Sequence, residues 1–181
     1  MRIGLQITKN KQKYETLKSL IDVSNLPKIS FIHIDSDNKL KKELKNLDIL
    51  VTYGISPELF NYRTERLKWI HVGASGIEQN LFTDLLKSKV MLTNAKGINS
   101  RPVAEFIMAQ ILYFAKQFNS CNQFKSDKIW KQWALAKDTK QLSNCTLGII
   151  GYGEIGKALS KLAKVFGMQV LATRRLQKKI E

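Results

Sequence analysis

The chain has 181 residues, 44% of them hydrophobic, a size and composition that suit one ordinary globular domain or two small ones. No apolar run approaches the ~18 residues of a membrane span, and Cys121 and Cys145 form no C-x-x-C motif, so we expect a reduced, cytoplasmic protein without a metal site. The net charge of +15 allows nonspecific contact with polyanions, but the lysines are scattered and lack interleaved aromatic residues, which argues against a specific nucleic-acid function.

Strands and helices alternate through the first half of the chain. Short apolar or alternating runs predict β-strands at residues 2–8, 28–35, 48–53, 67–72 and 90–94. Helical patterns fall between them, at residues 14–21, at 40–44, after Ser56-Pro57, and at 77–86. This alternation predicts a parallel sheet with right-handed crossovers, so the expected fold is α/β, with a flavodoxin-like parallel sheet in residues 1–98.

The next segment is a helix that is apolar on almost every face. Ser100-Arg101-Pro102 has the pattern of a cap and an early proline, and the helix is expected to run to about Phe118. A helix that is apolar all round must be buried on all sides, so we expect it between domains or in a subunit interface, which favours a homodimer. A central core helix of one domain is the alternative. Residues 119–133 are expected to be helical, and residues 134–144 to form a polar connection.

A strand, a glycine-rich turn, a helix and a second strand follow in residues 146–173. Gly151, Gly153 and Gly156 have the spacing G-x-G-x-x-G, and Gly167 is expected to end the helix. In such a unit the first glycine permits the tight turn, the second lets a pyrophosphate approach the backbone, and the third lets the helix pack on the strand. A tight turn in another kind of α/β domain is the alternative. The candidate cofactor-binding residues of this turn are Gly151, Tyr152, Gly153, Glu154, Ile155 and Gly156.

The end of the second strand indicates which dinucleotide binds. An acidic residue that holds the ribose 2′-OH of NAD is expected ~20 residues along, but no Asp or Glu lies between Glu154 and Glu181. Thr173, Arg174 and Arg175 stand there instead, and an arginine can pair with a 2′-phosphate. We therefore predict NADP(H) in preference to NAD(H). The alternative is that Arg174 and Arg175 are solvated charges of a loop. The absence of an acidic residue after the second strand also disfavours a Rossmann methyltransferase.

Four stretches together resemble the D-isomer-specific 2-hydroxyacid dehydrogenases. They are LKWIHVGASGIEQ at 67–79, MLTNAKGINSRPVAEFIMAQIL at 91–112, the region of Trp130 and Trp133, and TLGIIGYGEIG with its second strand. The V-A-E sequence that opens the long helix is more specific than the glycine motif alone. Arg174 stands where NAD-preferring members carry Asp. With this arginine the chain resembles the glyoxylate/hydroxypyruvate reductase branch of the family.

The resemblance implies hydride transfer between a nicotinamide cofactor and C2 of a 2-oxo acid. It implies that residues 1–98 form the substrate domain, and that residues 99–181 comprise an interdomain helix and the first part of an NAD(P)-binding Rossmann domain. Backbone N–H groups of Ser75 and Gly76 would hold the substrate carboxylate, although a simple strand-exit turn would have the same sequence. Tyr53 and Gly54 would face the substrate, and Val103 would lie near the nicotinamide.

One departure from the family's pattern concerns the catalytic residues. The family's catalytic Arg, Glu and His lie beyond the second cofactor strand, and no residue of this sequence matches them, so no catalytic residue is assigned. His33 and His71 lie inside predicted strands and lack the family's local context. We therefore expect an N-terminal fragment that is inactive alone. The alternative is a non-catalytic nucleotide-binding regulatory protein of the same fold.

Overall fold

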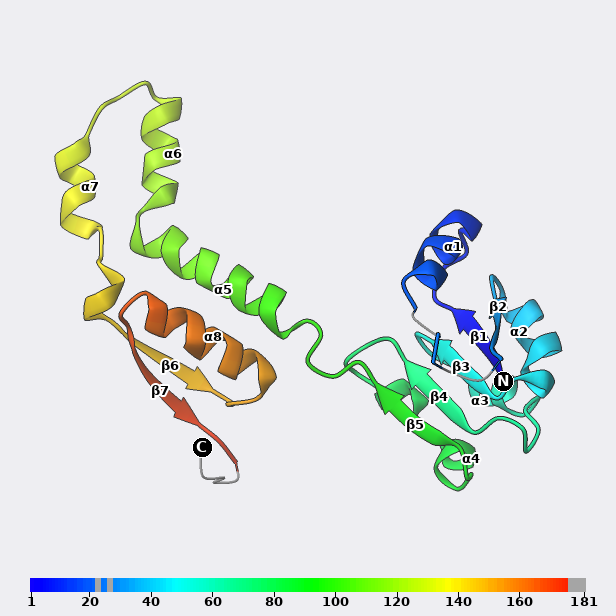
Figure 1. Ribbon diagram of the computed structural model, residues 1–181. Helices are drawn as coiled ribbons and strands as arrows, with labels where there is room; N and C mark the ends of the chain where they lie inside the picture. Colours follow the sequence, from blue (N-terminus) through cyan, green and yellow to red (C-terminus); the bar gives the residue numbers. More distant parts are fainter. Residues whose placement is uncertain (22–23, 26–27, 176–181) are drawn as a thin grey trace. The chain divides into compact units, whose positions relative to one another are not determined.

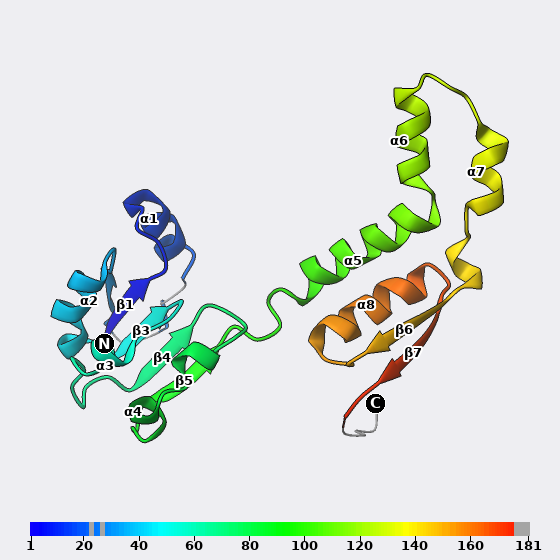
Figure 2. The ribbon, with the colours of Figure 1, turned by 180° about the vertical axis from the view of Figure 1, so that it is seen from behind.

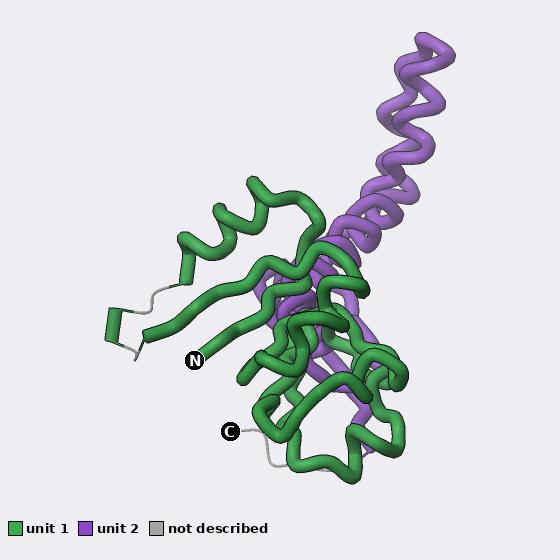
Figure 3. Tube along the Cα trace, turned by 90° about the vertical axis from the view of Figure 1, so that its right-hand side faces the viewer, with its two compact units in different colours: residues 1–96 green, residues 97–181 purple. Residues whose placement is uncertain are grey.

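The computed structural model describes residues 1–21, 24–25 and 28–175 (Figures 1 and 2). The chain forms two compact units, residues 1–96 and residues 97–181 (Figure 3). Each unit has its own cluster of buried apolar side chains. In the described part of the chain, no helix has both the length and the apolar character needed to cross a membrane.

The first unit is built on a parallel sheet with the strand order β2-β1-β3-β4-β5. Its described strands are β1 (Arg2–Gln6), β2 (Ser30–His33), β3 (Ile49–Thr52), β4 (Trp69–Val72) and β5 (Met91–Asn94). The central strand β1 pairs in parallel with β2 on one side and with β3 on the other. The expected parallel α/β sheet is therefore confirmed, and all its strands present their carboxyl ends at one edge.

Short helices connect these strands. They are α1 (Lys11–Ser19), α2 (Asp37–Glu43), α3 (Pro57–Phe60) and α4 (Thr83–Leu86), with 3-10 turns at Leu44–Asn46 and Glu78–Asn80. The side chains of Asn10, Ser36 and Ser56 accept backbone N–H groups at the starts of α1, α2 and α3, which satisfies donors that the helix leaves free. The cap predicted at Ser56 is confirmed.

The continuous helix expected over residues 77–86 is wrong. A 3-10 turn at Glu78–Asn80 and the separate helix α4 replace it. The reason is a tertiary contact: the buried side chain of Asn80 accepts the backbone N–H of Ile55 at 2.9 Å. Leaving that N–H unpaired in the core would cost about 1–3 kcal/mol, which outweighs the local helix preference.

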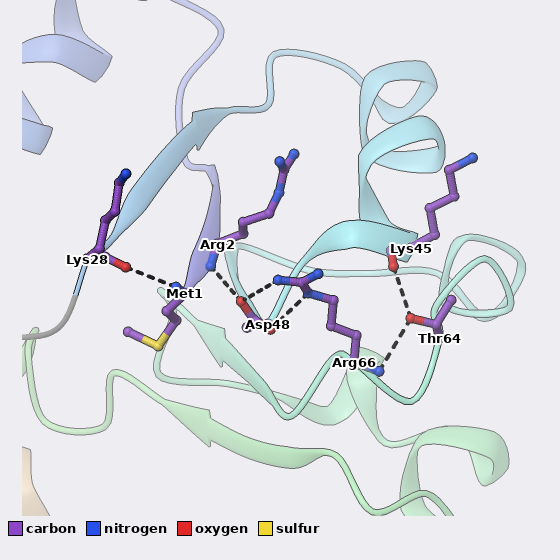
Figure 4. Close-up of polar contacts among 7 residues, drawn as sticks. All are labelled: Met1, Arg2, Lys28, Lys45, Asp48, Thr64 and Arg66. Atoms are coloured by element: carbon purple, nitrogen blue, oxygen red, sulfur yellow. Dashed lines mark hydrogen bonds and ion pairs between the residues drawn. The ribbon is translucent and has the colours of Figure 1, made fainter.

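The amino ends of the strands are held together by one carboxylate. Asp48 accepts the backbone N–H of Arg2 at 2.6 Å and two guanidinium N–H groups of Arg66 at 2.9 and 3.3 Å (Figure 4). Thr64 adds a link by donating its hydroxyl to the carbonyl oxygen of Lys45 at 2.9 Å. The hydrogen bonds from Arg66 and from the Arg2 backbone lower the pKa of Asp48. Asp48 therefore ties β1 to the segment before β4.

The second unit begins with three helices and ends with a strand–helix–strand unit. Its described elements are α5 (Ser100–Ala115), α6 (Phe118–Ser126), α7 (Gln132–Asp138), a 3-10 turn at Leu142–Asn144, β6 (Thr146–Ile150), α8 (Glu154–Val165) and β7 (Gln169–Thr173). Strands β6 and β7 pair in parallel. Helix α8 packs along α5 and lies over the strand pair (Figures 1 and 2). The strand–turn–helix–strand prediction is confirmed, as is the helix end at Gly167, whose φ is +75°.

Small side chains let α5 and α8 approach closely. Ala104 on α5 and Ala163 on α8 are fully buried, with Met108 and Leu159 beside them. The opposite face of the strand pair is bare, since Ile150 is 96% exposed and Leu171 is 67% exposed. In the described residues, β6 and β7 pair only with each other, which leaves the open sheet edge that the sequence predicts.

Two expectations about helix α5 are wrong in detail. Ser100 is the first residue of α5 and not its cap, because its hydroxyl donates back to the carbonyl oxygen of Gly97 at 2.6 Å. Helix α5 ends at Ala115, before Gln117 turns the chain with a φ of 54°. Phe106 and Phe114 are 65% and 69% exposed, so the second unit does not cover every face of α5, and its expected place between domains or in a subunit interface stays a prediction.

The helical stretch expected over residues 119–133 also differs. It is divided between α6 and α7, and α7 extends to Asp138, inside the region expected to be a polar connection. The break coincides with Lys128, whose φ of 54° is incompatible with a continuing helix.

Candidate functional site

The glycine turn between β6 and α8 has the backbone conformation that its sequence predicts. Gly151 has a φ of +94°, a region that side chains with a Cβ rarely adopt. The N–H groups of Gly151 and Tyr152 donate to the carbonyl oxygen of Thr173 at 3.1 and 3.2 Å, so the turn is attached to the end of β7. The carboxyl ends of β6 and β7 therefore meet at one corner, which the glycine turn forms.

Gly153 and Gly156 differ in what surrounds them. A Cβ added at Gly153 would meet no atom within 4 Å, whereas a Cβ at Gly156 would lie 2.7 Å from the carbonyl oxygen of Gly151. Gly153 is thus open on its outer side, and Gly156 is where helix and turn touch. These are the two environments needed for close approach of a pyrophosphate and for close helix packing.

The start of α8 offers hydrogen-bond donors. Gly153 occupies the cap position and supplies no side chain to accept the first N–H groups of the helix. Such groups, together with the helix dipole, attract anions. The carboxylate of Glu154 is engaged by Lys157 Nζ at 3.1 Å, and Ile155 is 43% exposed beside it. The residues present fit a dinucleotide pyrophosphate.

The start of α5 lies next to this corner. Gly97 has a φ of +87°, and a Cβ there would lie 3.7 Å from Cγ of Glu154. Val103, further along α5, is half-buried. The turn at Gly97 and the first turn of α8 are therefore neighbours within the second unit.

Arg174 and Arg175 follow the end of β7 directly. Both are exposed, and within the described residues 1–21, 24–25 and 28–175 neither has an ion pair. Because Thr173 accepts the N–H groups of the glycine turn, the two arginines start where the turn is anchored. Their charges are available for an anionic group near that corner.

The proposed substrate residues of the first unit lie at the carboxyl edge of the sheet. Tyr53 and Gly54 follow β3, where the Thr52 hydroxyl accepts the N–H of Gly54 at 3.1 Å. Tyr53 is 62% exposed, and its ring lies over Gly73, whose added Cβ would lie 3.2 Å from Tyr53 Cε1. The loops after β3 and β4 therefore touch through this pair.

Ser75 and Gly76 lie in the loop after β4. Asn94 donates its side-chain amide to the carbonyl oxygen of Ser75 at 2.6 Å, and the Ser75 hydroxyl donates to the carbonyl oxygen of Ala95 at 3.3 Å. These bonds hold the loop against the end of β5. A Cβ at Gly76 would lie 2.9 Å from a carboxylate oxygen of Glu78, so an acidic group stands beside the proposed carboxylate site.

Sequence reasoning missed a hollow at the same edge. A cavity of about 420 Å³ lies at the ends of β1 and β2 and reaches Tyr53; its lining includes Gln6, Lys9, Asp35 and Asp37. Hydrogen bonds from Ser36 and Lys39 lower the pKa of Asp35. The signal in the sequence was the position of these polar residues directly after two parallel strands, where ligands of such sheets bind.

The two histidines have structural partners, as predicted for His71. His71 Nδ1 lies 2.8 Å from the Thr93 hydroxyl. His33 Nε2 lies 2.7 Å from the carbonyl oxygen of Thr8, and its ring stacks on Tyr14 at 4.5 Å. In the described residues, no group of His, Cys, Asp and Glu is placed to hold a metal ion.

Comparison with known proteins agrees with this geometry. Residues 108–181 match the sequence model of the NAD binding domain of D-isomer specific 2-hydroxyacid dehydrogenases. Residues 108–181 are thus similar to the cofactor domain of that family. The match covers α8, both strands of the second unit and the glycine turn, and it confirms the resemblance seen in the sequence.

Individual relatives show the extent of the similarity. The chain is 29% identical over 143 residues to D-3-phosphoglycerate dehydrogenase of Dictyostelium discoideum, covering 75% of this chain and 33% of the relative. It is 30% identical over 142 residues to glyoxylate reductase of Thermococcus litoralis, covering 76% and 43%. The chain thus spans less than half the length of these relatives.

Solved structures confirm the α/β fold. A D-lactate dehydrogenase from Treponema pallidum superposes with a TM-score of 0.76 at 21% identity, covering 99% of this chain and 55% of that one. At this identity the likeness concerns the fold, a parallel α/β architecture with a Rossmann-type unit.

Proposed function

We propose that this chain is part of an NAD(P)-dependent oxidoreductase that acts on the CH–OH group of a 2-hydroxy acid and reduces a 2-oxo acid such as glyoxylate or hydroxypyruvate. The supporting observation is the glycine turn, in which Gly151 provides the positive φ, Gly153 the open approach and Gly156 the close helix contact. The similarity of residues 108–181 to the family's NAD binding domain supports a dinucleotide as the ligand of this turn.

In this proposal, the pyrophosphate binds N–H groups in the segment from Gly153 to Gly156. Tyr152 and Thr173 shape the corner, and Val103 borders the nicotinamide. The cofactor supplies the hydride when it is bound. Arg174 and Arg175 pair with a 2′-phosphate, which makes NADP(H) the preferred form. Within the described residues neither guanidinium group has an ion pair, and both groups follow the anchored end of β7, which supports this preference.

The first unit, as the substrate domain, holds the acid. The N–H groups of Ser75 and Gly76 bind its carboxylate, and Tyr53 and Gly54 face the rest of the molecule. The hydrogen bonds that fix the Ser75 loop to Asn94 and Ala95 support a preformed site. In these terms residues 1–98 bind the substrate, and residues 99–181 carry the interdomain helix and the first part of the cofactor domain.

The 181 residues alone are proposed to bind cofactor without turnover. Reduction of a 2-oxo acid needs a proton donor and a group that polarises the carbonyl near the hydride. Both histidines are engaged by Thr8 and Thr93 inside the first unit's sheet region, which supports their exclusion as proton donors. Glyoxylate-dependent oxidation of NADPH by this polypeptide would contradict this part of the proposal.

We also propose a homodimer that covers the apolar surface of the second unit. Phe106 and Phe114 on α5 are 65% and 69% exposed, and Trp130 and Trp133 are 86% and 77% exposed. Exposed aromatic residues are typical of protein interfaces. The two free cysteines fit a reducing, cytoplasmic setting. Sedimentation should give twice 20.7 kDa, and a monomer at high concentration would oppose this point.

The cofactor proposal is tested by titrating the 181-residue chain with NADPH and with NADH, following nicotinamide fluorescence. Tighter binding of NADPH, by about tenfold for one added charge-assisted contact, is the expected result. Equal affinities would remove the preference for NADP(H) and leave the dinucleotide site intact. Binding of neither cofactor would refute the proposal itself.

A further inference from the structure

A second hollow lies on the first unit, at the ends of the strands opposite to those that carry the proposed substrate loops. It has a volume of about 570 Å³ and is formed by the segment 63–68, which leads into β4, and the segment 87–90, which leads into β5. Leu67, which is 2% exposed, and the half-buried Val90 contribute its apolar lining. Because both segments precede parallel strands, the hollow lies at the amino ends of the sheet, whereas Ser75 and Gly76 lie at the carboxyl ends.

The lining of this hollow is strongly basic. Its cationic residues are Arg63, Lys68, Lys87 and Lys89, and its only carboxylate belongs to Glu65. Within the described residues, none of these four cations takes part in an ion pair, although other lysines and arginines of the unit do. Like charges gathered without counter-charges repel one another, and an anion bound among them would relieve that repulsion.

One of the four cations is held in place. The guanidinium of Arg63 lies 3.8 Å above the ring of Phe60 and donates Nη1 to the Phe60 carbonyl oxygen at 3.2 Å. Since Phe60 is fully buried, its ring is a fixed platform. The remaining donors of the guanidinium are thus preorganised for a phosphate or carboxylate, which lowers the entropic cost of binding.

The opposite wall is also fixed. The Ser88 hydroxyl donates to the carbonyl oxygen of Leu85 at 2.7 Å and accepts the N–H of Val90 at 3.2 Å. These bonds set the path of the chain between Lys87 and Lys89, so the two lysines extend from a defined turn. A hollow with two anchored walls and four cations differs from an evenly charged surface.

We propose that this hollow binds a small multivalent anion of the phosphate class, such as pyrophosphate or a phosphate ester. The volume lies within the range of small-molecule sites, about 300–1,000 Å³, and the lining contains four cationic donors but no aromatic ring on which nucleic-acid bases could stack. The proposal is independent of the cofactor site, because the hollow lies wholly within the first unit.

The test uses the full 181-residue chain and inorganic pyrophosphate as the probe, measured by calorimetric titration at low salt. The variant K87E/K89E reverses two charges in the hollow. The matched control K11E/K13E makes the same change in net charge at two exposed lysines of α1, outside the hollow. A second pair, K87Q/K89Q, removes charge without placing acids after α4, and thermal unfolding checks that each variant is folded.

We expect K87E/K89E to weaken pyrophosphate binding by about 10–100-fold and K11E/K13E by less than about threefold, since exposed distant charges are screened. R63K should weaken binding while it keeps the charge. Because the glycine turn is itself proposed to bind a pyrophosphate, the difference between K87E/K89E and K11E/K13E, and not the total binding, reports on this hollow. The proposal would be overturned if both charge-reversal variants lost the same affinity, or if only single-stranded RNA displaced the probe. It would also be overturned if the wild type bound no pyrophosphate up to about 10 mM.

Discussion

Replacing Gly153 by alanine should separate cofactor binding from folding. The added Cβ would meet no protein atom within 4 Å, and the φ of −85° is one that alanine adopts readily. The folded state therefore accepts the methyl group without strain. We expect the free energy of unfolding to stay the same or to rise by about 0.4–1 kcal/mol, because alanine reduces the entropy of the unfolded chain.

The same methyl group points into the space through which a pyrophosphate must approach the backbone. Hydrogen bonds to a charged group contribute about 1.5–3 kcal/mol each. Loss of one or two of them would weaken NADPH binding by about 10-fold to more than 1,000-fold. The effect on affinity is thus expected to be large while the effect on stability is small or favourable.

Fluorescence titration with NADPH and urea unfolding measure the two quantities on the same samples. Gly148→Ala is the matched control, because a Cβ at Gly148 also meets nothing within 4 Å but lies in the middle of β6. It should bind NADPH like the wild type. If Gly153→Ala bound NADPH normally, or if Gly148→Ala lost as much affinity, the assignment of the pyrophosphate to this turn would be wrong.

Three further substitutions test other parts of the account. Gly156→Ala places a Cβ 2.7 Å from the Gly151 carbonyl oxygen and should lower the free energy of unfolding by about 1–3 kcal/mol in urea titrations; unchanged stability would show that the contact is not tight. Arg174→Asp should weaken NADPH binding by about 10–100-fold and spare NADH, and parallel losses would argue against a 2′-phosphate contact. Asp48→Asn should cost about 1–3 kcal/mol at pH 7. Because the folded-state pKa of Asp48 is lowered, its contribution is present above the ordinary aspartate pKa of ~3.9 and is lost as pH falls through the folded value. Wild type and Asp48→Asn should therefore converge in acid, and a constant difference down to about pH 2 would contradict this.

The sequence was sufficient to predict the strand–turn–helix–strand unit. Its glycines are specified by backbone geometry: Gly151 by its positive φ, and Gly156 by a contact only about five residues back along the chain. Local requirements of this kind are visible in a sequence because no distant residue has to be known. The same holds for the cap at Ser56, whose partner is the N–H of Leu59 three residues later.

Features that depend on distant partners could not be predicted. The helix expected over residues 77–86 is interrupted because Asn80 pairs with Ile55, 25 residues earlier. Likewise, the basic hollow joins residues near Arg63 to residues near Lys89, which the sequence separates by a strand and a helix. Within the sequence the lysines looked scattered, and only the fold brings these four cations together.

The most direct test of the central claim is an amide NMR titration of the 181-residue chain with NADPH. The account predicts that the largest shifts fall on Gly153, Ile155, Gly156 and Arg174. Small shifts are expected around Gly148, which serves as an internal reference on β6. Shifts confined to other regions, or none at saturating cofactor, would show that the glycine turn is not a dinucleotide site in this protein.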